Sequence, residues 1–137
     1  MSVAAGTRSV VIEREIAHPP EKIWRALTQP HLIAEWLMQN DFVPATGHRF
    51  TLTADWGSVA CEVLVLEPNK TLAYSWSAMG VETIVTFGLT PTKGGTHLRV
   101  EQSGFATDAA NDRYYSGAQF GWQKFIASLE EVVARLD

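Results

Sequence analysis

The chain has 137 residues, the size of a single domain, and a formal net charge of −4. A mildly acidic chain without a basic stripe is not expected to bind nucleic acid. It contains no signal-peptide core, no apolar run of about 20 residues that could span a bilayer, and only one cysteine, Cys61, which excludes an intramolecular disulfide. We therefore expect a soluble, cytoplasmic protein with one domain over residues 8–137 and a disordered N-terminus over residues 1–7.

The first third of the chain predicts a strand followed by two short helices. Residues 9–16 alternate between apolar and polar side chains, as a half-buried strand does. Pro20 favours the start of a helix over residues 20–28, because its missing N–H would have no partner in the first turn. Pro30 ends that helix and can begin a second, short one. An irregular connection is expected over residues 40–48.

The middle of the chain predicts an antiparallel sheet. Five segments show the pattern of strands: residues 50–54, 59–66, 72–76, 81–89 and 97–101. Short turns join them, so neighbouring strands must be antiparallel, because parallel neighbours need long crossovers. The segment 59–66 is apolar on both faces, which is typical of a central or curled strand.

The last part of the chain carries the strongest periodic signal. Apolar residues recur every three or four positions: Tyr115, Ala118, Trp122, Phe125, Leu129, Val132 and Leu136. This spacing predicts an amphipathic helix of about six turns, which needs a sheet to lie on. The predicted fold is α+β, with a curved antiparallel sheet of about six strands wrapped around a long C-terminal helix and two short helices after the first strand.

Several blocks of the sequence resemble one known family. AHPPEKIWRALT at residues 17–28, followed by Pro30 and Trp36-Leu37, resembles the opening of homologues of the activator of the 90-kDa heat-shock-protein ATPase. Later blocks resemble the same family and extend the resemblance over about residues 10–136: Pro68 with LAYSW at 72–76, GTHLRV at 95–100, Gly121-Trp122 and Leu129. That family belongs to the SRPBCC superfamily, so the resemblance implies the START-like helix-grip fold and an apolar cavity between the last helix and the sheet.

The resemblance has limits. The family often has two glycines before the strand that starts near Phe50, where this chain has Thr46-Gly47-His48-Arg49. A chain of 137 residues also has no room for the separate chaperone-binding domain of the eukaryotic activator. Because the superfamily includes lipid carriers, polyketide cyclases and toxin-sequestering proteins, the resemblance implies a fold and a cavity, not chaperone activation.

The expected cavity would be lined mainly by aromatic side chains. The predicted ligand-binding residues are Trp36, Phe50, Tyr74, Trp76, Val85, Phe87, Phe105, Gly121, Trp122 and Phe125. The five Trp and an aromatic content of 10% favour a pocket, and a solid core of large rings is the alternative. Gly117 and Gly121 lie four residues apart in the predicted helix, where they either kink it, let it cross a strand closely, or leave room for a ligand.

Three functions are compatible with these patterns. The preferred one is binding of a small apolar, aromatic or lipid-like ligand. The second is a cavity-based enzyme of the cyclase or hydrolase type, with Glu35, Tyr74 or Arg49 for acid–base chemistry, although no matched pair is visible. The third is a chaperone-associated interaction module. Six residues are candidates for polar contacts in the cavity: Tyr74, Glu35, Glu82, Arg49, Gln102 and Asn40.

Neither a metal site nor a cofactor is expected. Four histidines lack the spacing of metal ligands: His18, His31, His48 and His97. No glycine-rich phosphate loop or nucleophile elbow is present, so no catalytic residue is assigned. A homodimer is a further hypothesis, because an exposed sheet edge invites pairing.

Overall fold

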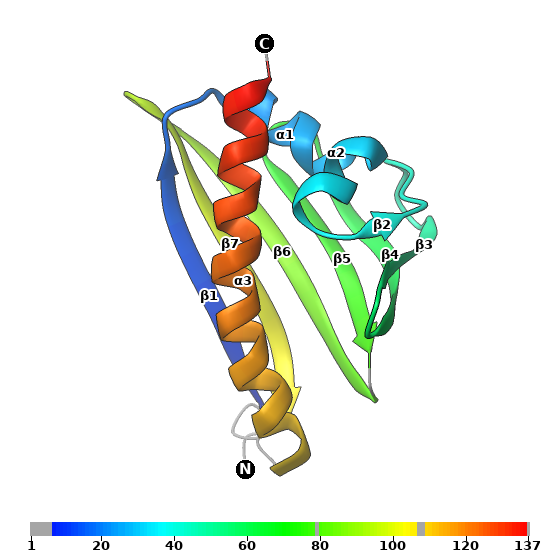
Figure 1. The fold of residues 1–137 in the computed structure, drawn as a ribbon. Helices are drawn as coiled ribbons and strands as arrows, with labels where there is room; N and C mark the ends of the chain where they lie inside the picture. The colour runs from blue at the N-terminus through cyan, green and yellow to red at the C-terminus, as the bar shows by residue number, and fades with distance from the viewer. Residues whose placement is uncertain (1–6, 79, 107–108, 137) are drawn as a thin grey trace.

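The computed structural model describes residues 7–78, 80–106 and 109–136. A strand, β1 (Thr7–Ile16), is followed by two short helices, α1 (Pro20–Thr28) and α2 (Pro30–Trp36). Six strands then run from β2 to β7: β2 (Gln39–Asn40), β3 (Arg49–Ala54), β4 (Gly57–Glu67), β5 (Thr71–Ala78), β6 (Val81–Thr92) and β7 (Gly95–Ala106). A 27-residue helix, α3 (Ala109–Arg135), ends the fold. The predicted α+β fold is confirmed (Figure 1). The expectation of disorder over residues 1–7 lies outside the described residues, except for Thr7, which begins β1.

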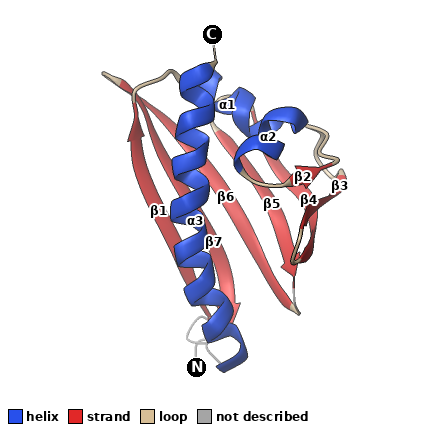
Figure 2. Ribbon diagram, viewed as in Figure 1, coloured by secondary structure: helices blue, strands red, loops and turns tan. Residues whose placement is uncertain are grey.

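All strands belong to one seven-stranded sheet in the order β1-β7-β6-β5-β4-β3-β2, and every neighbouring pair is antiparallel. The helices lie on one face of this sheet (Figure 2). Helix α3 contacts β1 and β7 as well as α1 and α2. The far strands β3, β4 and β5 therefore meet α3 less closely, and this asymmetry positions the pocket described below.

Prolines begin both short helices, as the sequence predicts. Their inner faces are apolar: Ile23 and Leu27 of α1 are 0% and 2% exposed, and Trp36 of α2 is 3% exposed. The Trp36 indole N–H donates to the Ala26 carbonyl at 2.7 Å, which joins the two helices by a buried hydrogen bond. These helices cover the sheet beside the C-terminal end of α3 (Figure 1).

The structure contains one strand that the sequence pattern does not reveal. Residues 40–48 were expected to be irregular, but Gln39 and Asn40 form β2 by pairing with Thr53 and Leu52 of β3. The Asn40 side chain donates to the Pro30 and Met38 carbonyls and accepts from the Phe42 N–H. A two-residue strand is too short to show a period, so only the pairing defines it.

The register of β4 shifts between Val63 and Val65, where the strand has a bulge against β5. The bulge explains why this segment is apolar on both faces: Val59 and Val63 are buried, whereas Leu64 and Val65 are 40% and 38% exposed on the other side. Elsewhere in the sheet, Gly95 begins β7 with φ +155°, and a Cβ there would collide with the Ile16 carbonyl of the neighbouring strand β1. Glycine is therefore required where β7 meets the end of β1.

Candidate functional site: an aromatic pocket beside α3

A pocket of about 510 Å³ lies between the N-terminal half of α3 and the sheet. Strands β5, β6 and β7 contribute Trp76, Val81 and Gln102 to it. Met38 follows α2, and Trp56 stands in the turn between β3 and β4. The helix side is formed by Tyr114, Gly117, Ala118, Gly121, Trp122 and Phe125. The pocket is therefore assembled from six separate parts of the chain.

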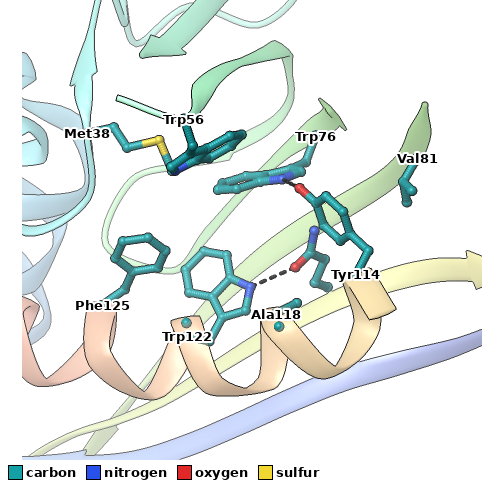
Figure 3. Close-up of a pocket in the computed structure, with 11 residues that line it drawn as sticks. Met38, Trp56, Trp76, Val81, Tyr114, Ala118, Trp122 and Phe125 are labelled. Carbon is teal, nitrogen blue, oxygen red and sulfur yellow. Dashed lines mark hydrogen bonds between the residues drawn. The ribbon is translucent and has the colours of Figure 1, made fainter. Parts of the chain in front are cut away.

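Aromatic rings form most of its wall. Trp122 is the centre of the cluster, with ring centroids 5.6 Å from Trp76 and 5.6 Å from Phe125. Trp56 and Met38 lie across the pocket from Phe125 and Trp122 (Figure 3). Trp56 is 51% exposed, whereas Trp76 and Trp122 are 4% and 2% exposed, so Trp56 forms the rim. The arrangement offers several ring faces and edges to a flat apolar molecule.

A hydrogen-bonded chain fixes one side of the pocket. The Trp122 indole N–H donates to the Gln102 side-chain oxygen at 2.7 Å, and the Gln102 amide nitrogen donates to the Thr83 hydroxyl at 2.9 Å. Thr83 in turn donates to the Trp76 carbonyl at 3.0 Å. Because an indole nitrogen can only donate, the oxygen of Gln102 must face Trp122, which settles the orientation of the amide. Gln102 is 1% exposed, and the chain satisfies it within the protein.

A second hydrogen bond joins α3 to β5. The Trp76 indole N–H donates to the Tyr114 hydroxyl oxygen at 2.9 Å (Figure 3). Burial raises the pKa of the Tyr114 hydroxyl, and the hydrogen bond from Trp76 opposes that rise. Tyr114 is therefore a neutral phenol at physiological pH, and both of the buried indoles in the wall have a partner for their N–H group.

Charge is missing from the described wall of the pocket. The described residues that line it include no carboxylate, ammonium, guanidinium or imidazole group. Burying an isolated charge without a partner is costly. The pocket therefore suits an uncharged molecule.

The two glycines of α3 border the pocket. Among the described residues, nothing lies within 4 Å of a Cβ placed on Gly117, and a Cβ on Gly121 would meet only the Phe125 ring at 3.8 Å. The hypothesis that these glycines let α3 cross a strand closely is therefore wrong, because no described strand atom lies within 4 Å of a Cβ placed at either position. Their absent side chains instead enlarge the pocket.

The predicted site residues divide into two groups. Trp76, Gly121, Trp122 and Phe125 line the pocket. The others are buried in the core and are not among the lining residues: Trp36, Phe50, Tyr74, Val85, Phe87 and Phe105.

Ring-to-ring packing explains why these aromatic residues face no open space. Phe50 contacts Tyr74 with centroids 5.1 Å apart, Tyr74 contacts Phe87 at 5.7 Å, and Phe87 contacts Trp36 at 6.1 Å. Phe105 packs against Tyr115 at 5.4 Å. The aromatic content favoured a pocket, with a solid core of large rings as the alternative, and the structure contains both. The rings named in this paragraph form a solid core, whereas Trp76, Trp122 and Phe125 border a pocket.

Sequence reasoning missed some of the lining residues: Met38, Trp56, Val81, Tyr114 and Ala118. Ala118 belongs to the predicted apolar face of the helix, and Tyr114 precedes it by one helical turn, so helical spacing could have found both. Trp56 lies in a turn, where no period applies. A large aromatic residue in a short polar turn was the available signal for it. Gln102 and Gly117 were considered as candidates, and both line the pocket.

The other polar candidates lie elsewhere. Glu35 pairs with Arg135 at 2.9 Å, and Arg49 pairs with Glu62 at 3.5 Å, in both cases near the surface. The Asn40 side chain donates to the Pro30 carbonyl and so holds the connection after α2. Glu82 is exposed and does not line the pocket. Tyr74 is 3% exposed in the core, where burial raises its hydroxyl pKa well above the usual value.

Two further features bear on chemistry. Cys61 is 5% exposed, and burial raises its thiol pKa to about 12, so it is an inert core residue rather than a nucleophile. Within the described part of the chain, His, Cys, Asp and Glu form no group that could hold a metal ion.

No helix among the described residues is long and apolar enough to cross a membrane.

Comparison with known proteins agrees with this architecture. The protein MLL2253 from Mesorhizobium loti is 57% identical, with a TM-score of 0.89 over 95% of this chain and 99% of that one. BH1534 from Bacillus halodurans is 27% identical, with a TM-score of 0.81 over 92% and 96% of the two chains. CalU16 from Micromonospora echinospora, at 23% identity and a TM-score of 0.78 over 90% and 73%, shares the fold. No match was found among curated proteins.

A family model gives the assignment. The model described as "Activator of Hsp90 ATPase homolog 1-like protein" matches residues 17–134, which is most of the chain. The solved relatives have the same SRPBCC-like fold. The chain therefore belongs to the family of Activator of Hsp90 ATPase homolog 1-like proteins.

Proposed function

We propose that this protein binds a small, uncharged, apolar or aromatic ligand in the pocket beside α3. One observation carries the proposal: a pocket of about 510 Å³ is walled by aromatic rings and small helix residues and is not filled by the protein's own side chains. That volume lies within the range of about 300–1,000 Å³ that is usual for sites of small ligands. The polar side chains in its wall are few and fixed, as in other sites that recognise apolar molecules.

We propose that a ligand enters the pocket at its rim, beside Trp56. This residue is 51% exposed and stands in the turn between β3 and β4, and turns are more mobile than strands. A ligand that enters beside Trp56 would bury this indole as well as its own surface. Burial of apolar surface contributes about 25 cal/mol for each Å², so covering this ring alone favours binding.

Binding is preferred over acid–base catalysis for a chemical reason. General acid–base chemistry needs a titratable group within hydrogen-bond reach of the substrate. Glu35 and Arg49 lie in surface ion pairs, and Tyr74 is in the core. Tyr114 is the titratable residue among the described lining residues, and its raised pKa makes it a poor proton donor or base near pH 7.

The proposal is tested by thermal unfolding of the purified protein against a panel of apolar small molecules, with native mass spectrometry beside it. A ligand at a hundred times its dissociation constant stabilises the folded state by about 2.7 kcal/mol, which is a measurable shift in Tm. A clear shift or a co-purifying mass is expected. A flat response to chemically diverse compounds, with no adduct mass, would contradict the proposal and favour a protein partner.

A matched pair of variants locates the site. Ala118→Leu adds bulk to a residue that lines the pocket and should abolish the ligand-induced shift. Ala127→Leu makes the same change on an exposed position of α3 and should leave the shift intact. If both variants respond like the unchanged protein, the ligand binds elsewhere.

Three further expectations accompany this proposal. We propose a single domain over residues 8–137 and a cytoplasmic location, the latter because the one cysteine is a buried free thiol. We also keep the hypothesis of a homodimer, since β1 and β2 are the edge strands of an open sheet. Light scattering of the purified protein during gel filtration measures the mass in solution, and a monomer mass at all concentrations would exclude the dimer.

A further inference from the structure

The hydrogen-bonding groups of the pocket wall are almost all used within the protein. The indole N–H of Trp122 is bound to Gln102, and that of Trp76 is bound to Tyr114. Neither indole nitrogen can accept a hydrogen bond, so neither has anything left to offer a ligand. The third indole of the wall, that of Trp56, lies at the rim and is 51% exposed, so its N–H faces competition from water. A polar contact inside the pocket must therefore come from another group.

Gln102 is also committed. Its oxygen accepts from Trp122, its nitrogen donates to Thr83, and the residue is 1% exposed. Rotating the amide towards a ligand would break both bonds in a buried place, which is costly. Gln102 therefore sets the position of Trp122 rather than serving as the main contact for a ligand.

Tyr114 differs from these residues. Its hydroxyl oxygen accepts from Trp76, and no acceptor for the hydroxyl hydrogen exists among the described residues. A phenol both donates and accepts, so within the described part of the chain the hydroxyl hydrogen of this residue, which lines the pocket, has no acceptor. Because Trp76 fixes the oxygen from one side, the hydrogen is directed away from Trp76.

We propose that Tyr114 is the polar anchor of the pocket, donating its hydroxyl hydrogen to an acceptor atom, such as a carbonyl oxygen, of an uncharged ring-containing ligand. This inference rests on the proposed function. It adds the polarity of the ligand and its orientation: the acceptor end lies at Tyr114, near the start of α3, and the rings lie against Trp76, Trp122 and Phe125. An anionic ligand is disfavoured, because the described wall holds no positive charge to offset its desolvation.

The test uses three small naphthalenes of similar shape. 2-Acetonaphthone carries a carbonyl acceptor, 2-ethylnaphthalene has a methylene in its place, and 2-naphthoate is an anion. Isothermal titration, with equilibrium dialysis for the poorly soluble hydrocarbon, gives the Kd of each. One added neutral hydrogen bond corresponds to about a fivefold preference for the ketone over the hydrocarbon. The anion is expected to bind at least about tenfold more weakly than the ketone.

Two variants separate the anchor from the wall. Tyr114→Phe removes the hydroxyl but keeps the ring, and should bring the Kd of the ketone to that of the hydrocarbon. It also leaves the Trp76 indole N–H without its partner, so the Kd of the hydrocarbon serves as the control for any change in the wall itself. Tyr115→Phe removes the same group from the next residue, whose hydroxyl donates to the Ser9 carbonyl and which does not line the pocket. It should leave the fivefold preference intact. Circular dichroism tests whether both variants are folded.

The outcomes distinguish the inference from the function on which it rests. Equal Kd values for ketone and hydrocarbon in the unchanged protein, or equal weakening of both by Tyr114→Phe, would overturn the anchor while the binding function stands. Naphthoate binding as tightly as the ketone would overturn the requirement for an uncharged ligand. If none of the naphthalenes binds, the proposed function fails together with the inference.

Discussion

The two halves of α3 meet the rest of the molecule in different ways. In residues 126–135 the inner side carries Ile126, Leu129, Val132 and Val133, which are at most 2% exposed. In residues 114–125 the side facing the far strands carries Gly117, Ala118 and Gly121, and a pocket lies there instead of a closed core. One helix thus serves as a core element along half of its length and as the wall of a site along the other half.

Side-chain size and the neighbouring helices account for this difference. The C-terminal half of α3 lies beside α1 and α2, which fill the space between α3 and the far strands (Figure 1). Among the described residues no helix fills that space beside the N-terminal half, and the small residues Gly117, Ala118 and Gly121 do not reach across it. The comparison shows that the small side chains of α3 beside the pocket are as important for its existence as the rings that surround it.

The largest expected loss of stability is in residues 126–135 of α3, here called the closed half of the helix. Leu129→Ala removes a side chain that is 0% exposed, and the cavity left behind should lower the free energy of unfolding by about 3 kcal/mol. Urea unfolding followed by circular dichroism measures this change. Glu131→Ala, on the exposed side of the same turn, should change stability by less than about 0.5 kcal/mol. A loss below about 1 kcal/mol for Leu129→Ala would mean that the closed half is as loosely packed as the pocket half.

The next effect concerns the hydrogen-bonded chain that joins the two sides of the pocket. Gln102→Leu leaves the buried indole N–H of Trp122 without a partner and should destabilise the fold by about 2 kcal/mol. Gln119→Leu, an exposed position on α3, is the matched control and should have little effect. Equal stability of both variants would show that the chain from Trp122 to Thr83 is dispensable, and that the pocket wall is held by apolar packing alone.

A smaller change, in this case a gain in stability, is expected when a glycine that borders the pocket is replaced. Gly121→Ala has room for its methyl group and removes the cost of glycine within a helix, so it should stabilise the protein by about 1 kcal/mol. Ala127→Gly on the exposed side of α3 should lower stability by about the same amount. Thermal unfolding compares the two. A destabilising Gly121→Ala would indicate that this half of α3 is packed more closely than the open pocket implies.

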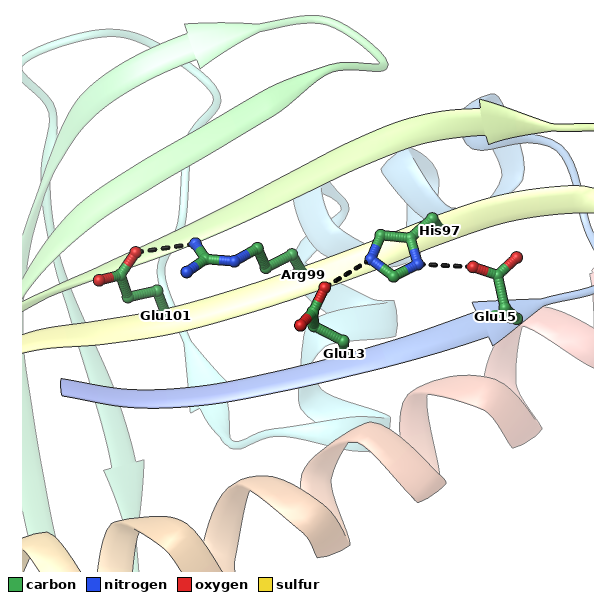
Figure 4. Close-up of polar contacts among 5 residues, drawn as sticks. All are labelled: Glu13, Glu15, His97, Arg99 and Glu101. Atoms are coloured by element: carbon green, nitrogen blue, oxygen red, sulfur yellow. Dashed lines mark hydrogen bonds and ion pairs between the residues drawn. The ribbon is translucent and has the colours of Figure 1, made fainter.

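The smallest effect is on the outer face of the strands beneath the closed half. His97 of β7 lies between two carboxylates of β1: its Nδ1 is 2.5 Å from Glu15 and its Nε2 is 2.8 Å from Glu13 (Figure 4). The hydrogen bonds to the two carboxylates raise the pKa of His97 above 6.5, and the bond to Glu15 has the larger effect of the two. Only an imidazolium can donate to both carboxylates at once. Arg99 and Glu101, the next charged residues on this face of β7, pair with each other at 2.8 Å.

The sign of the pH dependence follows from this shift. A group whose pKa is raised by folding contributes stability that is fully present below about pH 6.5 and is lost as the pH rises through the folded-state pKa. Urea midpoints between pH 5.5 and 9 should therefore fall more for the unchanged protein than for His97→Gln. Identical slopes in the two proteins would show that the His97 contact does not persist in solution. Because the His97 side chain is 34% exposed, the effect is expected to be small.

The sequence predicts the fold in detail because its signals are local. Each element can be predicted from a short stretch of the chain. This is true of the prolines that begin α1 and α2, of the strands with a period of two, and of the long apolar stripe of α3. In β7, Leu98, Val100 and Gln102 are buried on one face, which is the period of two that a strand has. The strand period could not pair Gln102 with Trp122, since these residues are brought together only when α3 lies on the sheet.

The sequence by itself determined the α+β architecture, the inward faces of the sheet and of α3, and the presence of more rings than a small core requires. Only the tertiary structure decided which rings border the pocket: Trp76 and Trp122 do, whereas Phe50, Phe87 and Phe105 close the core. Periodicity gives the direction in which a side chain points, but not the distance to whatever stands opposite. That distance is set by how α3 packs between β1, β7 and the two short helices, and it alone separates a wall from a filled interior.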